Sequence, residues 1–223
     1  MVTFNVDDKN LSAPEGTPLL QACLDNGIYI PNLCYLPGDE HPPASCRLCM
    51  VEVSGTPAPV PACTVPVTEG LIAYTGTDRV RRLQRSAIKL LLSNHRVECA
   101  RCSANKRCAL QKMAKFLKVG LNRGKLADLV QEPRKKEEEH PYLKYHPARC
   151  VLCGRCVRMC SRLHPRPLLF FAGRGLCTHI SFFGTDENSA AVCTSCFACV
   201  EICPVGALEK RQDSAENTGD EKT

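Results

Sequence analysis

Residues 193–204 read CTSCFACVEICP, a run in which four cysteines have the spacing C-x2-C-x2-C-x3-C and Pro204 follows directly. A second run with the same cysteine spacing lies upstream, as CVLCGRCVRMC at residues 150–160. Two-residue spacers let three thiolates converge on one group of metal atoms, while the fourth thiolate serves a neighbouring group. The two runs therefore predict that the C-terminal half contains a pair of crossed metal sites.

The spacing is that of bacterial ferredoxins with two [4Fe–4S] clusters, and the second run also has their proline. We expect the fourth cysteine of each run to begin a helix that points toward the other cluster. One cluster would then be held by Cys150, Cys153, Cys156 and Cys203, and the other by Cys193, Cys196, Cys199 and Cys160. Zinc knuckles need only paired C-x2-C, and they would leave the third and fourth cysteines of each run without a role.

The N-terminal part has four cysteines of its own, with the spacing C-x11-C-x2-C-x13-C: Cys34, Cys46, Cys49 and Cys63. This spacing departs from the plant-type ferredoxin pattern C-x4-C-x2-C. Four thiolates suit either one [2Fe–2S] cluster or one zinc ion. The residues alone favour the iron–sulfur interpretation and leave zinc open.

A mixed set occupies the middle of the chain, where one histidine and three cysteines are spaced H-x3-C-x2-C-x5-C: His95, Cys99, Cys102 and Cys108. One imidazole and three thiolates can bind a zinc ion or a [4Fe–4S] cluster. The position of this set between other cysteine motifs favours the cluster. A neutral imidazole in place of a thiolate makes such a cluster less negative.

The chain has seventeen cysteines, an odd number, and the start MVTFNVDDKN lacks the pattern of a secretory signal. A disulfide framework is therefore not expected, and such cysteine usage in a reducing cytosol indicates metal binding. The four sets leave only Cys23 and Cys177. We expect both to pack as small apolar side chains.

The formal charge of +6 counts every cysteine as neutral. Four oxidised clusters with their ligands carry about −7 in total, so the loaded protein is nearly neutral. Nucleic acid is therefore not an expected partner, and the basic stretches 79–85 and 134–136 are interpreted as solvated faces or partner contacts. No apolar run reaches the roughly 18 residues that a bilayer-spanning helix needs, so membrane insertion is not expected.

The periodicity of apolar residues predicts an α+β chain with short elements. Strands are expected at 2–6, 50–53, 71–74, 168–171 and 178–183, and helices at 17–27, 78–93 and 110–117. In the second helix we expect Val80, Leu83, Ala87, Ile88 and Leu91 to form the buried face. The predicted domains are residues 1–76, 77–119 and 141–210, with a linker at 120–140 and a disordered tail at 211–223.

The sequence contains no dinucleotide-binding GxGxxG, no Walker A loop and no serine or cysteine nucleophile motif. We therefore expect no catalytic residues and no bond-making chemistry in this chain. Four redox centres without a substrate site are typical of an electron conduit.

In their order along the chain, these motifs resemble a known family. The resemblance rests on IPNLC at 30–34, CRLCMVEV at 46–53, PAC at 61–63, the histidine and cysteine set, and CPVGAL at 203–208. The chain resembles the small diaphorase subunit of NAD-linked [NiFe] hydrogenases. It is also similar to the N-terminal iron–sulfur part of the large complex I iron–sulfur subunit and of multimeric [FeFe] hydrogenases.

The resemblance implies a β-grasp [2Fe–2S] domain, a small helical His/Cys3 [4Fe–4S] domain and a ferredoxin-like domain with two [4Fe–4S] clusters. It assigns the [2Fe–2S] cluster to Cys34, Cys46, Cys49 and Cys63. It also implies a cytoplasmic complex with an FMN/NAD(H)-binding iron–sulfur subunit and a hydrogenase small subunit, either simple or electron-bifurcating.

Two other functions are compatible with these motifs. The same conduit can serve a formate dehydrogenase, an aldehyde or sulfur-compound oxidoreductase, or a complex-I-like assembly. A zinc-stabilised interaction scaffold is the alternative from another class, because zinc also binds sets of four thiolates.

Overall fold

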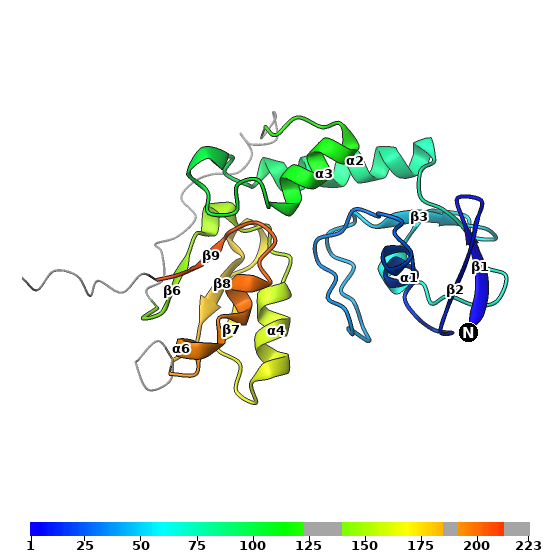
Figure 1. Ribbon diagram of the computed structural model, residues 1–223. Coiled ribbons are helices and arrows are strands. Elements are labelled where there is room, and N and C mark those ends of the chain that lie inside the picture. The colour runs from blue at the N-terminus through cyan, green and yellow to red at the C-terminus, as the bar shows by residue number, and fades with distance from the viewer. Residues whose placement is uncertain (123–139, 185–190, 212–223) are drawn as a thin grey trace, which may run out of the picture.

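The computed structural model describes residues 1–122, 140–184 and 191–211, and it has the expected α+β character (Figure 1). The N-terminal sheet and α1 form one part, α2 and α3 lie between, and the remaining elements form the C-terminal part. The expected linker and tail lie almost wholly outside the described residues, as does the basic stretch 134–136. The domain boundaries remain predictions.

The N-terminal part is a five-stranded sheet with the strand order β2-β1-β5-β3-β4. Its strands are β1 Val2–Val6, β2 Lys9–Ala13, β3 Met50–Val53, β4 Val60–Pro61 and β5 Ile72–Tyr74. The central pair β1 and β5 is parallel, whereas the other neighbouring strands are antiparallel. The hairpin between β1 and β2 turns at Asp7 and Asp8, which both have positive φ, as a tight two-residue hairpin requires.

One face of this sheet is covered by α1, Leu19–Asp25. Alternate residues of β1 point inward, so Val2, Phe4 and Val6 are buried against the helix residues Leu19 and Leu20. The helix ends near Gly27, whose φ of +73° is easily adopted only without a side chain. A small sheet packed on one helix places the long loop 27–49, with its cysteines, at the edge of this part.

Helix α2, Asp78–Ser93, leads from the N-terminal sheet toward the C-terminal part (Figure 1). Its start is fixed because the side-chain oxygen of Thr77 accepts a hydrogen bond of 3.2 Å from the backbone N–H of Val80. The buried face includes Gln84, whereas Leu83 is exposed, so the predicted face was wrong at this position. The Gln84 amide donates to the carbonyl oxygen of Met50 at 3.1 Å and thereby ties α2 to β3.

Helix α3, Ala109–Leu117, packs against α2 and ends at Lys118, which adopts a left-handed conformation. The Arg81 guanidinium of α2 lies 4.6 Å from the centre of the Phe116 ring. This cation–π contact joins the outer faces of the two helices. Within the described ranges, no helix combines the length and apolar character needed to cross a membrane.

In the described residues of the C-terminal part, there are two small antiparallel sheets and three helices. One sheet pairs β6 Leu143–Tyr145 with β9 Leu208–Lys210, and the other pairs β7 Leu169–Ala172 with β8 His179–Phe182. The helices are α4 Arg155–Leu163, α6 Cys193–Cys196 and α7 Ala198–Glu201. Short 3₁₀ turns span Ala62–Thr64, Cys99–Arg101, Pro147–Arg149 and Gly175–Cys177.

The buried side chains form two apolar cores. The smaller one fills the N-terminal sheet and α1, and the larger one fills α2, α3 and the C-terminal part. Leu33 and Leu48 come from the N-terminal loop 27–49 but belong to the larger core. This loop therefore joins the N-terminal part to the rest of the molecule.

Candidate metal centres

The four N-terminal cysteines lie together at the boundary between the two cores. Cys34 and Cys46 belong to the larger core, while Cys49 and Cys63 belong to the smaller one. All four are buried, and the Sγ atoms of Cys34 and Cys46 are 3.4 Å apart. The backbone N–H of Ala62 donates to the carbonyl of Cys49 at 2.8 Å, which brings the segment of Cys63 beside Cys49.

These thiols interact strongly as two pairs. Hydrogen bonding to Cys46 lowers the pKa of Cys34 to about 5, and hydrogen bonding to Cys49 lowers the pKa of Cys63. The pKa values of Cys46 and Cys49 are raised, because each shares a proton with its partner and is buried. Within each pair, the thiol with the lowered pKa, Cys34 or Cys63, loses its proton before its partner, and a bound metal would favour the thiolate form of all four.

The middle set lines one cavity of about 20 Å³, whose wall includes all four predicted ligands: His95, Cys99, Cys102 and Cys108. The Nδ1 atom of His95 lies 2.8 Å from the carbonyl oxygen of Arg149. Because a carbonyl only accepts, Nδ1 carries the proton and Nε2 keeps its lone pair for a metal. Burial lowers the pKa of His95, so the neutral, ligating form is favoured.

The first of the two predicted [4Fe–4S] ligand sets of the C-terminal part, called the first cubane set below, also lines a single cavity of about 20 Å³. Cys203 of the second run lies there beside the three cysteines of the first run: Cys150, Cys153 and Cys156. Apolar side chains, including Tyr145 and Ile180, complete its wall. Burial raises the pKa of Cys153 to about 12 and also raises the pKa of Cys156. Because burial favours the neutral thiols of Cys153 and Cys156, the positive charge of a metal centre would be needed to hold them as thiolates.

In the second cubane set, predicted as Cys193, Cys196, Cys199 and Cys160, the residue Cys160 comes from the first run and lies near the second run. Burial raises the pKa of Cys193 to about 11 and that of Cys199 to about 12, and the neighbouring cysteines, Cys160 among them, add to both shifts. The fourth member, Cys196, has its Sγ atom 3.3 Å from Nε2 of His164. The backbone N–H of Leu168 donates to the Cys160 sulfur at 3.3 Å.

The two fourth cysteines do not begin helices, so that expectation was wrong. Cys160 lies inside α4, one turn after Cys156, and Cys203 follows the end of α7. A helical turn separates Cys156 from Cys160 along one face, so a single helix carries cysteines of both cubane sets. Gly154, with φ +70°, directly precedes this helix.

The two cysteines outside the sets differ from each other. Cys23 is fully buried in α1 among leucines, as expected, and burial raises its pKa to about 12. Cys177 is exposed, so the expectation that it packs was wrong. It lies in the 3₁₀ turn between β7 and β8, at the surface end of that hairpin.

The donor sets fit iron–sulfur clusters. Thiolates are soft ligands that suit these clusters. The His95 set and the first cubane set each line a cavity. Among the residues that the structure describes, no group of three or more His, Cys, Asp or Glu side chains is positioned to hold a single metal ion. Backbone N–H groups of Leu152 and Ala207 donate to the sulfurs of Cys150 and Cys203 at 3.4 and 3.3 Å, which stabilises charge on sulfur.

Several residues around these sites were not found from the sequence. Arg149 holds His95 through its carbonyl, and its guanidinium binds Glu209 at 2.9 Å. Arg158 and Arg162 of α4 both bind Asp39 of the N-terminal loop. The i, i+4 spacing of these two arginines was a visible signal, but the sequence gave no indication of their partner.

Three family models match the chain in sequence. They describe a 2Fe-2S iron-sulfur cluster binding domain at residues 1–78, an NADH-ubiquinone oxidoreductase-G iron-sulfur binding region at 84–123, and a ferredoxin-like domain of NADH-quinone oxidoreductase subunit 3 at 140–209. The chain therefore contains regions for binding both 2Fe-2S and 4Fe-4S clusters.

Curated relatives align with almost the whole chain. It is 32% identical to the NADP-reducing hydrogenase subunit HndD of Solidesulfovibrio fructosivorans, over 95% of this chain and 36% of that protein. It is also 32% identical to the NADH-ubiquinone oxidoreductase 75 kDa subunit of Reclinomonas americana, over 95% of this chain and 30% of that protein. The chain thus spans about a third of the length of these relatives.

A solved structure agrees with the fold. One chain of the crystal structure of NAD+-reducing [NiFe]-hydrogenase in the H2-reduced state matches with a TM-score of 0.75 and 28% sequence identity. The match covers 98% of this chain and 90% of that chain.

Proposed function

Because the chain resembles the iron–sulfur subunits of NAD(P)-linked hydrogenases and of complex I, we propose that it relays electrons within a multisubunit oxidoreductase of this kind. One [2Fe–2S] cluster is assigned to Cys34, Cys46, Cys49 and Cys63. Three [4Fe–4S] clusters are assigned to the His95 set, to the Cys150 set with Cys203, and to the Cys193 set with Cys160. When bound, such clusters supply sites that accept and release one electron at a time.

The observation that carries this proposal is that neighbouring sites share structural elements. Val205 lines the cavity of the His95 set and also that of the Cys150 set, and its carbonyl accepts a hydrogen bond of 3.8 Å from the Cys102 thiol. Helix α4 carries both Cys156 and Cys160, which belong to the two cubane sets. A series of sites joined in this way is suited to passing charge from one to the next.

The Cys150 set lies at the centre of this series. It shares Val205 with the middle set and α4 with the other cubane set, and Arg158 links its Cys153 to Cys34 of the N-terminal set. Tyr145 and Ile180 line its cavity, so part of the wall around the proposed cluster is apolar. The chain itself performs no bond-making chemistry in this proposal.

We propose two partners for this chain, an FMN/NAD(H)-binding iron–sulfur subunit and a hydrogenase small subunit. The likeness to NAD(P)-linked hydrogenases supports this choice. The complex I relatives favour a second version, in which the same conduit serves a complex-I-like assembly. We place the complex in the cytoplasm, because the fifteen cysteines of the proposed ligand sets must stay reduced to bind metal and need a reducing compartment.

The proposal is tested on the native complex, purified without oxygen through a tag on this chain. We expect it to contain the FMN-binding and hydrogenase subunits and to reduce NAD(P) with H2. Cys203→Ala should abolish this coupled reaction while NAD(P)H-driven dye reduction at the flavin continues. Loss of both activities to the same degree, or a native complex without a redox partner, would contradict the proposed function.

A further inference from the structure

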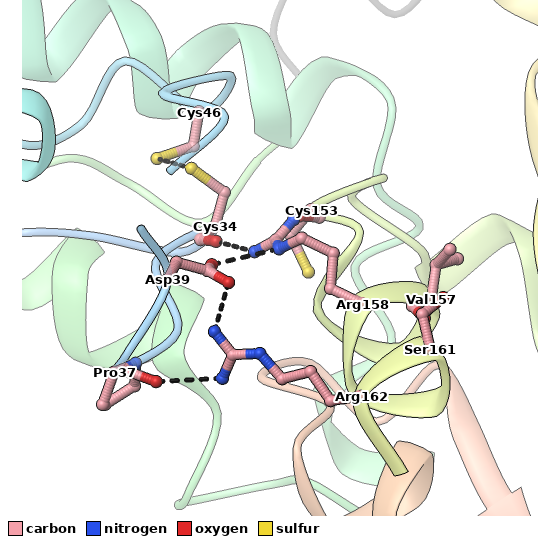
Figure 2. Close-up of polar contacts among 9 residues, drawn as sticks. All are labelled: Cys34, Pro37, Asp39, Cys46, Cys153, Val157, Arg158, Ser161 and Arg162. Carbon is pink, nitrogen blue, oxygen red and sulfur yellow. Dashed lines mark hydrogen bonds and ion pairs between the residues drawn. The ribbon is translucent and has the colours of Figure 1, made fainter. Parts of the chain in front are cut away.

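Helix α4 has one face with cysteines and another face with arginines. Cys156 and Cys160 lie one turn apart on one face, and Arg158 and Arg162 lie one turn apart on another, each two positions after a cysteine. Two positions correspond to about 200° around a helix, so the arginines point away from the cysteines. Figure 2 shows both guanidinium groups extending from α4 to the N-terminal loop that carries Cys34 and Asp39.

The guanidinium of Arg158 makes contacts in three directions. Its Nε atom binds the Asp39 carboxylate at 3.1 Å. Its Nη2 atom donates to the carbonyl oxygen of Cys34, and its Nη1 atom donates to the carbonyl oxygen of Cys153 at 3.4 Å. One side chain therefore holds the backbone of proposed ligands from two different sites (Figure 2).

Arg162 has a related but separate role. Its Nη2 atom binds the other oxygen of Asp39, and its Nη1 atom donates to the carbonyl of Pro37 at 2.9 Å. Neither contact involves a proposed ligand. The Asp39 side chain is 9% exposed, against 25% for Arg158 and 34% for Arg162, so the carboxylate is the best buried member of the group.

The three contacts made from position 158 suit an arginine side chain. A planar guanidinium with five N–H donors can bind a carboxylate and two carbonyls at once, whereas lysine presents a single ammonium. The Nη1 atom passes over Gly154, where an added Cβ would lie 3.2 Å away. A small residue at this position leaves room for the guanidinium.

We infer that Arg158 is a positioning residue that couples the N-terminal site to the central Cys150 site. It fixes the position of the Cys34 loop relative to the Cys153 loop. Its positive charge also raises the reduction potential of the cluster at the N-terminal site. A positive charge stabilises the reduced, more negative state, and two arginines against one aspartate leave net positive charge here. This inference rests on the proposed function.

The test is an anaerobic redox titration of the full chain, following the [2Fe–2S] signal by electron paramagnetic resonance. We expect Arg158→Gln to lower the equilibrium constant for reduction about tenfold, roughly threefold from the lost charge, which Asp39 and solvent partly screen, and roughly threefold from the lost positioning. This corresponds to about 59 mV for one electron. Arg158→Lys should lower it about threefold, because the charge remains but the fork is lost.

The matched control is Arg162→Gln, which removes the same charge from the same helix face without touching a proposed ligand. It should lower the constant about threefold at most, because it removes charge but no contact to a proposed ligand. Equal shifts in Arg158→Gln and Arg162→Gln, or no shift in either, would overturn the inference. A purely structural role predicts weaker folding of Arg158→Gln with an unchanged potential, which would also overturn it.

Two further outcomes are distinguishable. If Arg158→Gln does not take up iron, Arg158→Lys provides the test. An equilibrium constant for reduction that is about threefold lower than in the wild type supports the inference, and an unchanged constant contradicts it. If the wild-type chain itself shows no [2Fe–2S] signal, the proposed function has failed and not only the role of Arg158.

Discussion

The Nδ1 atom of His95 lies 2.8 Å from the backbone carbonyl oxygen of Arg149. This contact fixes the imidazole, so that Nε2 can face the cavity that Cys99, Cys102 and Cys108 line. Arg149 is itself held by Glu209 at 2.9 Å and by the carbonyl of Arg101 at 3.3 Å. The histidine is therefore oriented by a network that reaches β9, as metal-binding histidines usually are.

The first prediction concerns this histidine. His95→Ala should remove the middle cluster and lower the iron content by about four atoms per chain, whereas His95→Cys should keep it by supplying a thiolate. Anaerobic iron analysis of both variants measures the difference. The exposed His41 provides the control, His41→Ala, which should keep all the iron. Full iron content in both His95 variants would exclude His95 as a ligand.

The second prediction tests the crossing of the ferredoxin-like pair. Cys160→Ala should release the cluster of Cys193, Cys196 and Cys199, and Cys203→Ala should release that of the first run. Thiols freed from metal become reactive, so alkylation under anaerobic conditions followed by mass spectrometry reports which run has lost its cluster. If Cys160→Ala exposes Cys150 and Cys153 to alkylation and leaves the second run protected, the crossed assignment is wrong.

The third prediction concerns the contact between the middle and C-terminal sites. A Cβ added at Gly206 would lie 2.8 Å from Cβ of Ala104 and 3.1 Å from Oγ of Ser103. Gly206→Ala should therefore lower Tm, and Gly70→Ala is the matched control, with a similar φ but open space around it. We expect Gly206→Ala to lower Tm by about 2–8 °C more than the control. Equal values of Tm would show that the crowding has no cost.

The fourth prediction concerns pH and His140. This side chain is 1% exposed, and its Nδ1 atom accepts hydrogen bonds of 3.2 Å from the backbone N–H groups of Tyr142 and Leu143. Burial, and secondarily the charge of Arg211, lower its pKa below the ordinary value of 6.5. The unfolded chain then binds the extra proton more readily, so stability is lost as pH falls below about 6.5.

The measurement for His140 is Tm between pH 7.5 and 5.5 for the wild type and for His140→Asn, whose amide oxygen can replace Nδ1 as acceptor. Each pH unit should cost the wild type at most about 1.4 kcal/mol through this group. The variant should lose less stability on acidification, while the exposed control His41→Asn should follow the wild type. Parallel curves for all three proteins would exclude His140 as the cause.

The sequence was informative where a local signal specifies structure. Helix α2 has the expected bounds because Thr77 caps it and apolar residues recur at helical spacing. The strands β2, β4, β6 and β9 were missed, because each is too short or too polar to show a clear alternation of apolar residues. The last two also form only by pairing with each other across a long stretch of chain. Gln84, and not Leu83, lies on the buried face of α2, because its side-chain amide donates a hydrogen bond to the Met50 carbonyl oxygen. The periodicity of apolar residues could not predict this contact.

The cysteine spacing predicted which candidate ligands come together, including Cys203 in the cavity of the first run. Their assignment as ligands remains a prediction. Spacing could not reveal the Asp39 partner of Arg158, because the two residues are distant in sequence and meet only in the folded chain. Nor could it place Cys177, since a cysteine without spaced companions carries no signal for burial or exposure.

The central claim is that this chain holds four iron–sulfur clusters, and its metal content tests this most directly. Iron, acid-labile sulfide and zinc should be measured on the chain purified without oxygen. We predict about fourteen irons and about fourteen sulfides per chain, with almost no zinc. About ten irons would remove one [4Fe–4S] cluster from the account. About four zinc ions without sulfide would contradict it and would indicate a zinc-stabilised scaffold.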